Sequence, residues 1–430
     1  MKIALINPKG TIFGHKLLFG DIWDESKVSM STFRFLTCPN LGLLTVAALA
    51  SDYFDEIKYI DENIDTIDFD EKFDIVALSA MTNQIKRAYE VAGEFRSRNI
   101  PVIIGGIHAS ILPDEAKKYV DSVLVGEAEG IWDELMKDFQ NGKLKPIYSN
   151  DNKDIDLSVT PIPRYDLLNL KKHKIIPVQA SRGCPHNCEF CSVSKLFGSK
   201  YRYKKVEQVV QEIEAVKKVW DRPYIYFTDD NITVNKKYTK ELLNALIPLK
   251  IRWQGYSDIG IAEDDELLEL LYKSGCTSLL FGLESLSTAN LDSIEKWKAK
   301  QSEKYVQSVR KIQSHKIGVF GSFIVGLDND DTSVFKDIRD FIVDNNLYGA
   351  SISVQTPLPG TRLYSRLKEE NRITSEDWDK YTVTDVVIKP SKMTVSELEK
   401  GFSWLWKEIY SEDVVRRRTS HFKNILLGAG

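Results

Sequence analysis

Three cysteines lie close together near the middle of the 430-residue sequence, in the stretch Gly183-Cys184-Pro185-His186-Asn187-Cys188-Glu189-Phe190-Cys191. One loop can therefore bring three thiolates to one metal centre. On a four-iron cluster, three protein ligands leave one iron open, and an open coordination site distinguishes a catalytic metal centre from a closed structural one. The alternative is a zinc site completed by His186 or a distant residue, but the sequence has no second Cys or His pair for a zinc ribbon.

The spacing Cys-x-x-x-Cys-x-x-Cys, with the aromatic Phe190 before the last cysteine, resembles the radical S-adenosylmethionine (SAM) superfamily. The resemblance implies that Cys184, Cys188 and Cys191 hold a [4Fe–4S] cluster, with the amino and carboxylate groups of SAM on its free iron. In that family, electron transfer cleaves the sulfonium and yields a 5′-deoxyadenosyl radical that abstracts hydrogen, while the protein positions the cofactor and excludes water. An electron donor such as flavodoxin or ferredoxin is then the implied partner.

Further matches to this superfamily follow expected strands. Asp229 and Asp230 stand where the family contacts the methionine part of SAM, in place of the commoner Gly-Glu. Which of the two contacts the cofactor is open, and capping or turn formation is the alternative role. Glu284 matches the position used for the ribose hydroxyls, a natural task for a carboxylate acceptor. The other residues that the resemblance assigns to SAM are Phe190, Ser285, Ser322 and Val325.

Two series of alternating strands and helices must position these residues. The first series has strands expected at 2–6, 57–60, 75–79, 102–104 and 122–125, and the second at 176–181, 224–227, 251–256, 278–281, 319–325 and 351–354. Repeated strand–helix units predict parallel sheets that bind ligands at the carboxyl ends of their strands. The fold class is therefore α/β: a doubly wound, Rossmann-like sheet in residues 1–140, a linker at 141–173, a partial (β/α)6 barrel at 174–361 and a helical C-terminal region at 362–430.

The first series resembles the cobalamin-binding subclass of the superfamily. The turns Gly105-Gly106-Ile107-His108 and Gly126-Glu127-Ala128-Glu129 carry this match. Together with the stretches 323–328 and 356–364, they make the chain most similar to the hopanoid C-methylase-like group, whose enzymes use methylcobalamin to methylate an unactivated carbon. Cobalamin is thus an implied third cofactor, held at strand ends that carry Pro8, Ser79, Met81, Thr82, Gly105, Gly106, His108, Gly126 and Glu127.

Two further features of the sequence concern the predicted cobalamin site. The motif Asp-x-His-x-x-Gly, which supplies a cobalt-ligating histidine in other cobalamin proteins, is absent, so no lower axial histidine is expected. A connection of about thirty residues, 9–40, separates the first strand from its helix and contains Phe13, Phe19, Trp23, Phe33 and Phe35. Loops that long are usually functional or mobile, and this one is a candidate to close over a bound cofactor.

Charge and hydropathy argue against three classes of protein: nucleic-acid-binding, membrane-spanning and secreted proteins. The net charge of −4 gives no basic footprint for nucleic acid. No apolar run is long enough to span a bilayer, and the first residues read as a buried strand rather than as a signal peptide. We therefore expect a cytoplasmic protein that is not transmembrane. The resemblance to the hopanoid C-methylase-like group implies a small-molecule or lipid substrate. The isolated Cys38 and Cys276 are expected to be packing residues.

Three functions remain open from the sequence. The first is a cobalamin-dependent radical methylase, in which one SAM supplies the radical and another remethylates the cobalt. The second is a radical SAM enzyme with a vestigial cobalamin domain that performs cyclisation, dehydration or epimerisation. The third is a non-enzymatic metal-binding protein, against which the strand-end motifs beyond the cysteines argue. The sequence identifies neither the substrate nor the residue that exchanges hydrogen with it.

Overall fold

The structure, a computed structural model, describes residues 1–10, 38–150 and 154–428. Most of the long connection at 9–40, including all of its aromatic residues, lies outside these described residues. Among the described helices, none is both long and apolar enough to cross a membrane.

The N-terminal part of the chain forms a six-stranded parallel sheet in the order β2-β1-β3-β4-β5-β6. Its strands are β1 (Lys2–Asn7), β2 (Glu56–Asp61), β3 (Ile75–Ser79), β4 (Val102–Gly105), β5 (Ser122–Val125) and β6 (Ile147–Ser149). Apolar residues of α3 (Leu41–Ala50) and α7 (Trp132–Gln140) pack on one face, and those of α4 (Ile85–Arg96), α5 (Ile107–Ile111) and α6 (Pro113–Ala116) on the other. Covering on both faces explains why the central strands are almost wholly apolar.

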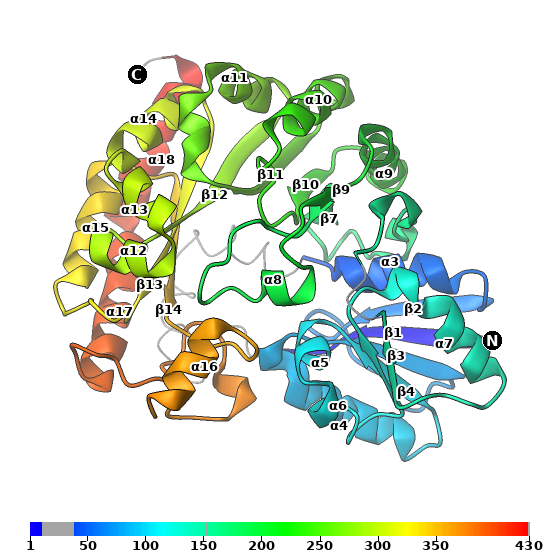
Figure 1. Ribbon diagram of the computed structural model, residues 1–430. Helices are drawn as coiled ribbons and strands as arrows, with labels where there is room; N and C mark the ends of the chain where they lie inside the picture. The colour runs from blue at the N-terminus through cyan, green and yellow to red at the C-terminus, as the bar shows by residue number, and fades with distance from the viewer. Residues whose placement is uncertain (11–37, 151–153, 429–430) are drawn as a thin grey trace.

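A second six-stranded parallel sheet follows, in the order β14-β13-β12-β11-β10-β7. Its strands are β7 (Ile176–Val178), β10 (Tyr224–Phe227), β11 (Arg252–Ser257), β12 (Cys276–Glu284), β13 (Gly318–Val325) and β14 (Gly349–Val354). The helices packed on it are α9 (Val206–Val219), α10 (Lys236–Leu246), α11 (Asp265–Lys273), α14 (Tyr305–Ser314), α15 (Val334–Asp344) and α17 (Val395–Ile409). The sheet curves, and its open side faces the N-terminal sheet (Figure 1).

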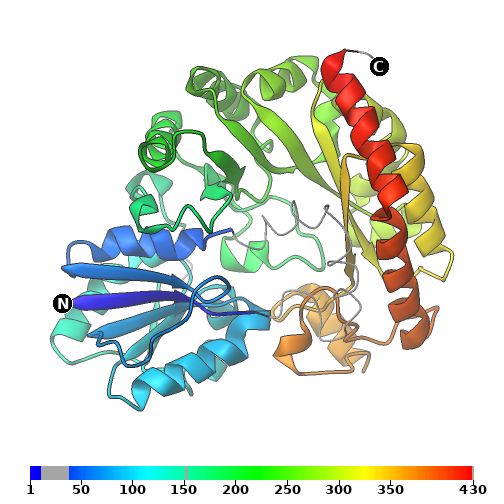
Figure 2. The same cartoon turned by 180° about the vertical axis from the view of Figure 1, so that it is seen from behind.

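Shorter elements complete the fold. The helices α8 (Val193–Leu196), α12 (Thr288–Ile294), α13 (Lys296–Ser302) and α16 (Arg362–Glu369) lie around the open side of the second sheet, and α18 (Glu412–Leu427) runs with α17 along its outer edge (Figure 2). Strands β8 (Ser181–Arg182) and β9 (Arg202–Tyr203) form an antiparallel hairpin. The 3-10 helices are η1 (Thr82–Gln84), η2 (Ala128–Gly130), η3 (Leu157–Val159), η4 (Tyr165–Leu167), η5 (Ile247–Leu249), η6 (Ile259–Glu263) and η7 (Trp378–Lys380).

The predicted fold class is confirmed, with local differences. The strand expected at 176–181 stops at Val178, because the next residues turn into the hairpin and the backbone N–H of Ala180 donates to Asp229 instead of to a neighbouring strand. Strand β6 joins the first sheet although it lies within the predicted linker 141–173. The domain limits proposed from the sequence remain a prediction.

Candidate functional site

The three clustered cysteines lie in the loop that connects β8 and β9. Gly183 starts this loop with a φ of +86°, and a Cβ there would lie 2.4 Å from the backbone oxygen of Lys200, so only glycine fits. Burial raises the pKa of all three thiols, to about 12 for Cys188 and about 11 for Cys191. Three free, partly buried thiols on one loop match the donors of an iron–sulfur cluster, whose binding would displace their protons.

The zinc alternative lacks support in the structure. No three His, Cys, Asp or Glu side chains among the described residues are arranged to hold a single metal ion. His186, the candidate fourth zinc ligand, instead stacks on Trp297 with 4.4 Å between ring centroids. No zinc ligand set that includes His186 is therefore formed among the described residues.

The two adjacent carboxylates after β10 have different surroundings. Asp229 is fully buried, and its carboxylate accepts hydrogen bonds from the Ala180 backbone N–H at 3.1 Å and the Ser181 hydroxyl at 2.5 Å. Asp230 lies close enough to Cys184 and Cys191 for its charge to raise the pKa of both thiols. Desolvation and the neighbouring Asp229 raise the pKa of Asp230 to about 7. Asp229 thus holds the backbone that leads into the cysteine loop, while Asp230 is the carboxylate beside the thiols.

Glu284 ends β12 in a left-handed conformation, with a φ of +63°. Its carboxylate accepts a hydrogen bond at 2.9 Å from Lys298 on α13, and the same ammonium group donates to the backbone oxygen of Gly282 at 2.8 Å. Both side chains are at most 10% exposed. Burial alone would lower the pKa of Lys298, but the neighbouring Glu284 outweighs burial and raises it above its usual value.

Lys298 is absent from the residues predicted from the sequence. Its neighbours Lys296 and Lys300 on the same helix are exposed, and no motif distinguishes Lys298 from them. Of the other predicted SAM-binding residues, Ser285 and Val325 are buried, whereas Ser322 and Phe190 are half-buried. The carboxylate–lysine pair is therefore the main feature of this site that only the tertiary structure identifies.

A cavity of about 690 Å³ lies between the carboxyl ends of the two parallel sheets. Its volume is typical of ligand sites. The first sheet and its turns contribute the predicted cobalamin residues Ser79, Met81, Gly105, Gly106, Gly126 and Glu127. The part of the chain that follows the first sheet contributes Gln179, Arg182, Leu196, Phe197, Tyr226 and Thr228. Both domains thus line one cavity.

The remaining predicted cobalamin residues, Pro8, Thr82 and His108, are not among the lining residues. His108 is fully buried, with its Nδ1 3.3 Å from the Thr82 hydroxyl and its Nε2 3.3 Å from Glu115. Burial lowers the pKa of His108, although Glu115 opposes this. Gly106 shapes the turn beside it: its φ is +91°, and a Cβ would lie 2.9 Å from the backbone nitrogen of Ala80.

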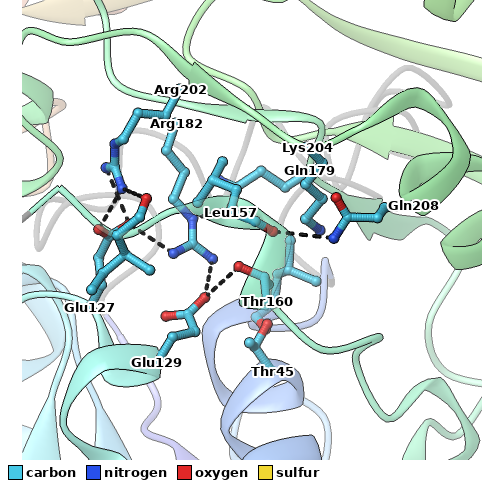
Figure 3. A network of polar contacts seen from close by, with 12 residues as sticks. Thr45, Glu127, Glu129, Leu157, Thr160, Gln179, Arg182, Arg202, Lys204 and Gln208 are labelled. Atoms are coloured by element: carbon cyan, nitrogen blue, oxygen red, sulfur yellow. Dashed lines mark hydrogen bonds and ion pairs between the residues drawn. The ribbon is translucent and has the colours of Figure 1, made fainter.

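A buried ionic network joins the cavity to the cysteine hairpin (Figure 3). Glu127 accepts hydrogen bonds at 2.7 Å from both Arg182 on β8 and Arg202 on β9. Arg182 also donates to Glu129 at 2.7 Å, and Thr160 donates to the same carboxylate at 3.1 Å. The side chains of these two acids and two arginines are at most 9% exposed. The Gly-Glu-x-Glu turn of the first sheet is therefore tied directly to the strands that flank the cysteines.

Models of three protein families match the chain. Residues 33–136 match the B12 binding domain, residues 178–342 the radical SAM superfamily, and residues 361–427 a domain of unknown function, DUF4070. The first two families account for the three expected cofactors, because radical SAM domains use a [4Fe–4S] cluster with SAM and B12-binding domains hold cobalamin. The predicted identity of the chain as a cobalamin-domain radical SAM enzyme is confirmed.

Relatives extend over nearly the whole chain. The bacteriochlorophyllide d C-12(1)-methyltransferase of Chlorobaculum tepidum is 33% identical over 402 residues, which cover 92% of this chain and 87% of the relative. The hopanoid C-2 methylase of Rhodopseudomonas palustris is 28% identical over 79% of this chain and 66% of its own length. The fold is shared with the solved structure of the methyltransferase TsrM from Kitasatospora setae, at a TM-score of 0.64 and 16% identity, over 93% of this chain and 85% of that one. This chain therefore belongs to the radical SAM superfamily of enzymes, in the group of methyltransferases that carry a B12-binding domain ahead of the radical SAM domain.

Proposed function

We propose that this protein is a cobalamin-dependent radical SAM C-methyltransferase that places a methyl group on an unactivated carbon of a small-molecule or lipid substrate. The single observation that carries the proposal is the shared cavity, which is lined by the strand ends of both domains. The names of the relatives support methylation at carbon, since two are bacteriochlorophyllide methyltransferases named for positions C-12(1) and C-8(2) and a third is a hopanoid C-2 methylase.

We assign separate roles in cofactor binding to the residues of the chain. When bound, the cluster and SAM supply a hydrogen-abstracting radical, and cobalamin supplies a methyl group. Cys184, Cys188 and Cys191 would hold the cluster. Asp230 and Glu284 offer carboxylate acceptors for the polar groups of SAM, with Lys298 as the cation beside Glu284.

Other residues of the chain complete the arrangement. Phe190, Ser285, Ser322 and Val325 are proposed to contact SAM, and the small-residue turns at Gly105 and Gly126 leave room for cobalamin. Leu196 and Phe197, which follow the three cysteines within the loop between β8 and β9, line the shared cavity and would help to exclude water from it. A flavodoxin or ferredoxin electron donor remains a prediction from the resemblance, and a cytoplasmic location remains a prediction from the composition.

Cyclisation without methyl transfer is the competing function. It is favoured by one observation, a 25% identity over 83% of this chain to the anaerobic magnesium-protoporphyrin IX monomethyl ester cyclase of Rubrivivax gelatinosus. The methyltransferases named above are more similar to this chain, and the first two match more than 85% of it. The proposed function therefore stays with methyl transfer.

Product analysis separates the two functions. Anaerobically reconstituted protein, given SAM, cobalamin and a strong reductant, should form both 5′-deoxyadenosine and S-adenosylhomocysteine, because one SAM is cleaved and another donates its methyl group. A variant with all three cysteines replaced by alanine should bind no iron and form no 5′-deoxyadenosine. Formation of 5′-deoxyadenosine by the wild-type protein without any S-adenosylhomocysteine would contradict methyl transfer and support the cyclase alternative.

A further inference from the structure

The C-terminal region contacts the cysteine loop directly. Helix α16 begins beside the loop, where the backbone N–H of Leu363 donates to the backbone oxygen of Glu189 at 3.0 Å. Arg366 binds the Glu189 carboxylate through two nitrogens, Nε at 2.6 Å and Nη2 at 3.1 Å. Arg362, one turn earlier, donates to the backbone oxygen of Asn187. Helix α16 therefore contacts the loop at two of the residues between Cys184 and Cys191.

The position of Glu189 makes these contacts relevant to metal binding. It lies directly after Cys188 and two residues before Cys191, so its carboxylate is attached to the segment that joins two thiols. Arg366 also pairs with Asp328, in the turn after β13, at 2.9 Å. A bidentate guanidinium–carboxylate pair fixes orientation as well as distance. The loop segment is thus held to the second sheet through Arg366.

The aromatic residue of the loop is held by the same region. Phe190 packs against a cluster from the C-terminal region that contains Leu363, Leu367 and Tyr381. It also contacts the small cluster formed by Ile294, Ile324 and Leu327. Phe190 therefore lies between α16 and the second sheet.

The C-terminal region reaches the cobalamin-binding domain as well. The indole Nε1 of Trp378 donates to Glu115 at 3.1 Å, and the ring of Trp378 meets that of His108 edge-on, with 5.3 Å between centroids. Trp378 also packs on Tyr381, with 4.8 Å between centroids. Residues 361–389 therefore contact both the cysteine loop and the helix that follows the Gly-Gly turn, and we call this segment the C-terminal bracket.

We infer that the C-terminal bracket fixes the cysteine loop in its cluster-binding shape, with Arg366 as the positioning residue. This inference rests on the proposed function, because it concerns the loop that would hold the cluster. It assigns a role to part of the region that matches the domain of unknown function. Arg366 acts through Glu189, because its guanidinium pairs with the carboxylates of Glu189, Asp328 and Glu370 and not with the thiols.

The test compares Arg366→Gln, Glu189→Gln and the double variant. Arg372→Gln is the matched control, since Arg372 pairs with Asp328 and Glu370 but not with Glu189. The measurement is the rate at which anaerobically reconstituted protein loses iron to a chelator, together with the electron paramagnetic resonance spectrum of the reduced cluster. Each single variant should take up iron but release it about three- to tenfold faster than the wild-type protein, a modest effect because the pair is partly exposed. The double variant should release iron no faster than either single variant, because residues that act through one another are not additive.

A second measurement separates this inference from the proposed function. Amide hydrogen exchange of the cluster-free full chain should be faster at residues 184–191 in Arg366→Gln than in the wild-type protein, and unchanged in α9. That result would support the inferred role of the C-terminal bracket even if the wild-type protein bound no cluster. Iron release and loop exchange in Arg366→Gln equal to those of Arg372→Gln, or additive effects in the double variant, would overturn it. If Arg366→Gln does not fold, Arg366→Lys, which keeps the charge but loses the bidentate geometry, should still show faster loop exchange.

Discussion

At the scale of single residues, Glu284 has two features that cost folding free energy. Its φ of +63° is uncommon for a residue with a side chain, and such conformations cluster at functional sites. Its partner Lys298 is buried, and a buried ion pair is often no more stabilising than an apolar pair of similar size. Neither feature is explained by stability alone, whereas a carboxylate held beside the cysteine loop suits the binding of a polar cofactor.

We predict that Glu284→Gln weakens SAM binding and leaves the iron content unchanged. Loss of one charge-assisted hydrogen bond costs about 1.5–3 kcal/mol, or about one to two decades in affinity. Calorimetric titration of the reconstituted protein with SAM measures this change. Glu303→Gln, at an exposed glutamate after α13, is the control and should bind SAM normally. Unchanged SAM affinity in Glu284→Gln would show that Glu284 has only a structural role.

The sequence could predict some of these residues but not their partners. The cysteine spacing and the position of Glu284 after a glycine-containing strand are local signals. The choice between Asp229 and Asp230 is not local, because it depends on Ala180 and Ser181, which lie about fifty residues earlier in the chain. The sequence likewise does not predict Lys298 as a site residue, because only the packing of α13 against β12 brings it to Glu284.

At the scale of elements, the ends of β3, β4 and β5 form one wall of the shared cavity. Gly105 and Gly106 differ in what they contribute to it. Position 106 requires glycine because of its positive φ and the close approach of the Ala80 backbone. A Cβ at Gly105, in contrast, would meet Leu124 at ordinary contact distances of 3.6 Å or more. Gly105 is therefore the position at which a side chain can be added without straining the fold.

We predict that Gly105→Val lowers the retention of cobalamin at least about tenfold, because its added methyl groups occupy space in the cavity wall where the cofactor would lie. The matched control is Gly93→Val on α4, where a Cβ would meet nothing within 4 Å. Cobalamin that remains after desalting is measured by absorbance in both variants and in the wild-type protein. Equal retention in Gly105→Val and Gly93→Val would place the cofactor elsewhere.

The order of strands and helices was predictable because buried parallel strands are long apolar runs, as in β1 and β3. The hairpin of β8 and β9 was not, because each strand is only two residues long and its pairing is set by Gly183 and by the ion pairs of Arg182 and Arg202. Elements of that length carry no periodicity that a sequence pattern could detect.

At the scale of the whole molecule, two sets of contacts hold the domains around the cavity. On one side, Glu127 and Glu129 of the first sheet pair with the arginines of the cysteine hairpin. On the other side, Trp378 of the C-terminal bracket packs on His108 and donates to Glu115. Only folding brings these residues together, so the turn Gly-Gly-Ile-His, which the resemblance assigned to cobalamin, also forms part of a domain contact.

The contact of Trp378 with His108 and Glu115 should make the free energy of unfolding depend on pH. Burial lowers the pKa of His108 below its usual 6.5, with Glu115 opposing. The folded state therefore resists protonation while the unfolded state accepts it, and stability is lost as the pH falls below about 6.5. We predict that the denaturant midpoint of the wild-type protein falls more than that of His108→Gln between about pH 8 and pH 5. His421→Gln, at an exposed histidine on α18, should follow the wild-type profile; parallel profiles for all three proteins would contradict a buried neutral His108.

The central claim is that one chain holds both an iron–sulfur cluster and cobalamin. It is tested most directly by measuring iron and cobalt in the same sample of full-length protein, reconstituted anaerobically with excess hydroxocobalamin and then desalted. We expect about four iron ions and about one cobalt ion per chain, with no histidine nitrogen bound to the cobalt, since no histidine is among the described residues that line the cavity. A full complement of iron with no retained cobalt would contradict the claim, because it would leave the N-terminal domain without its cofactor.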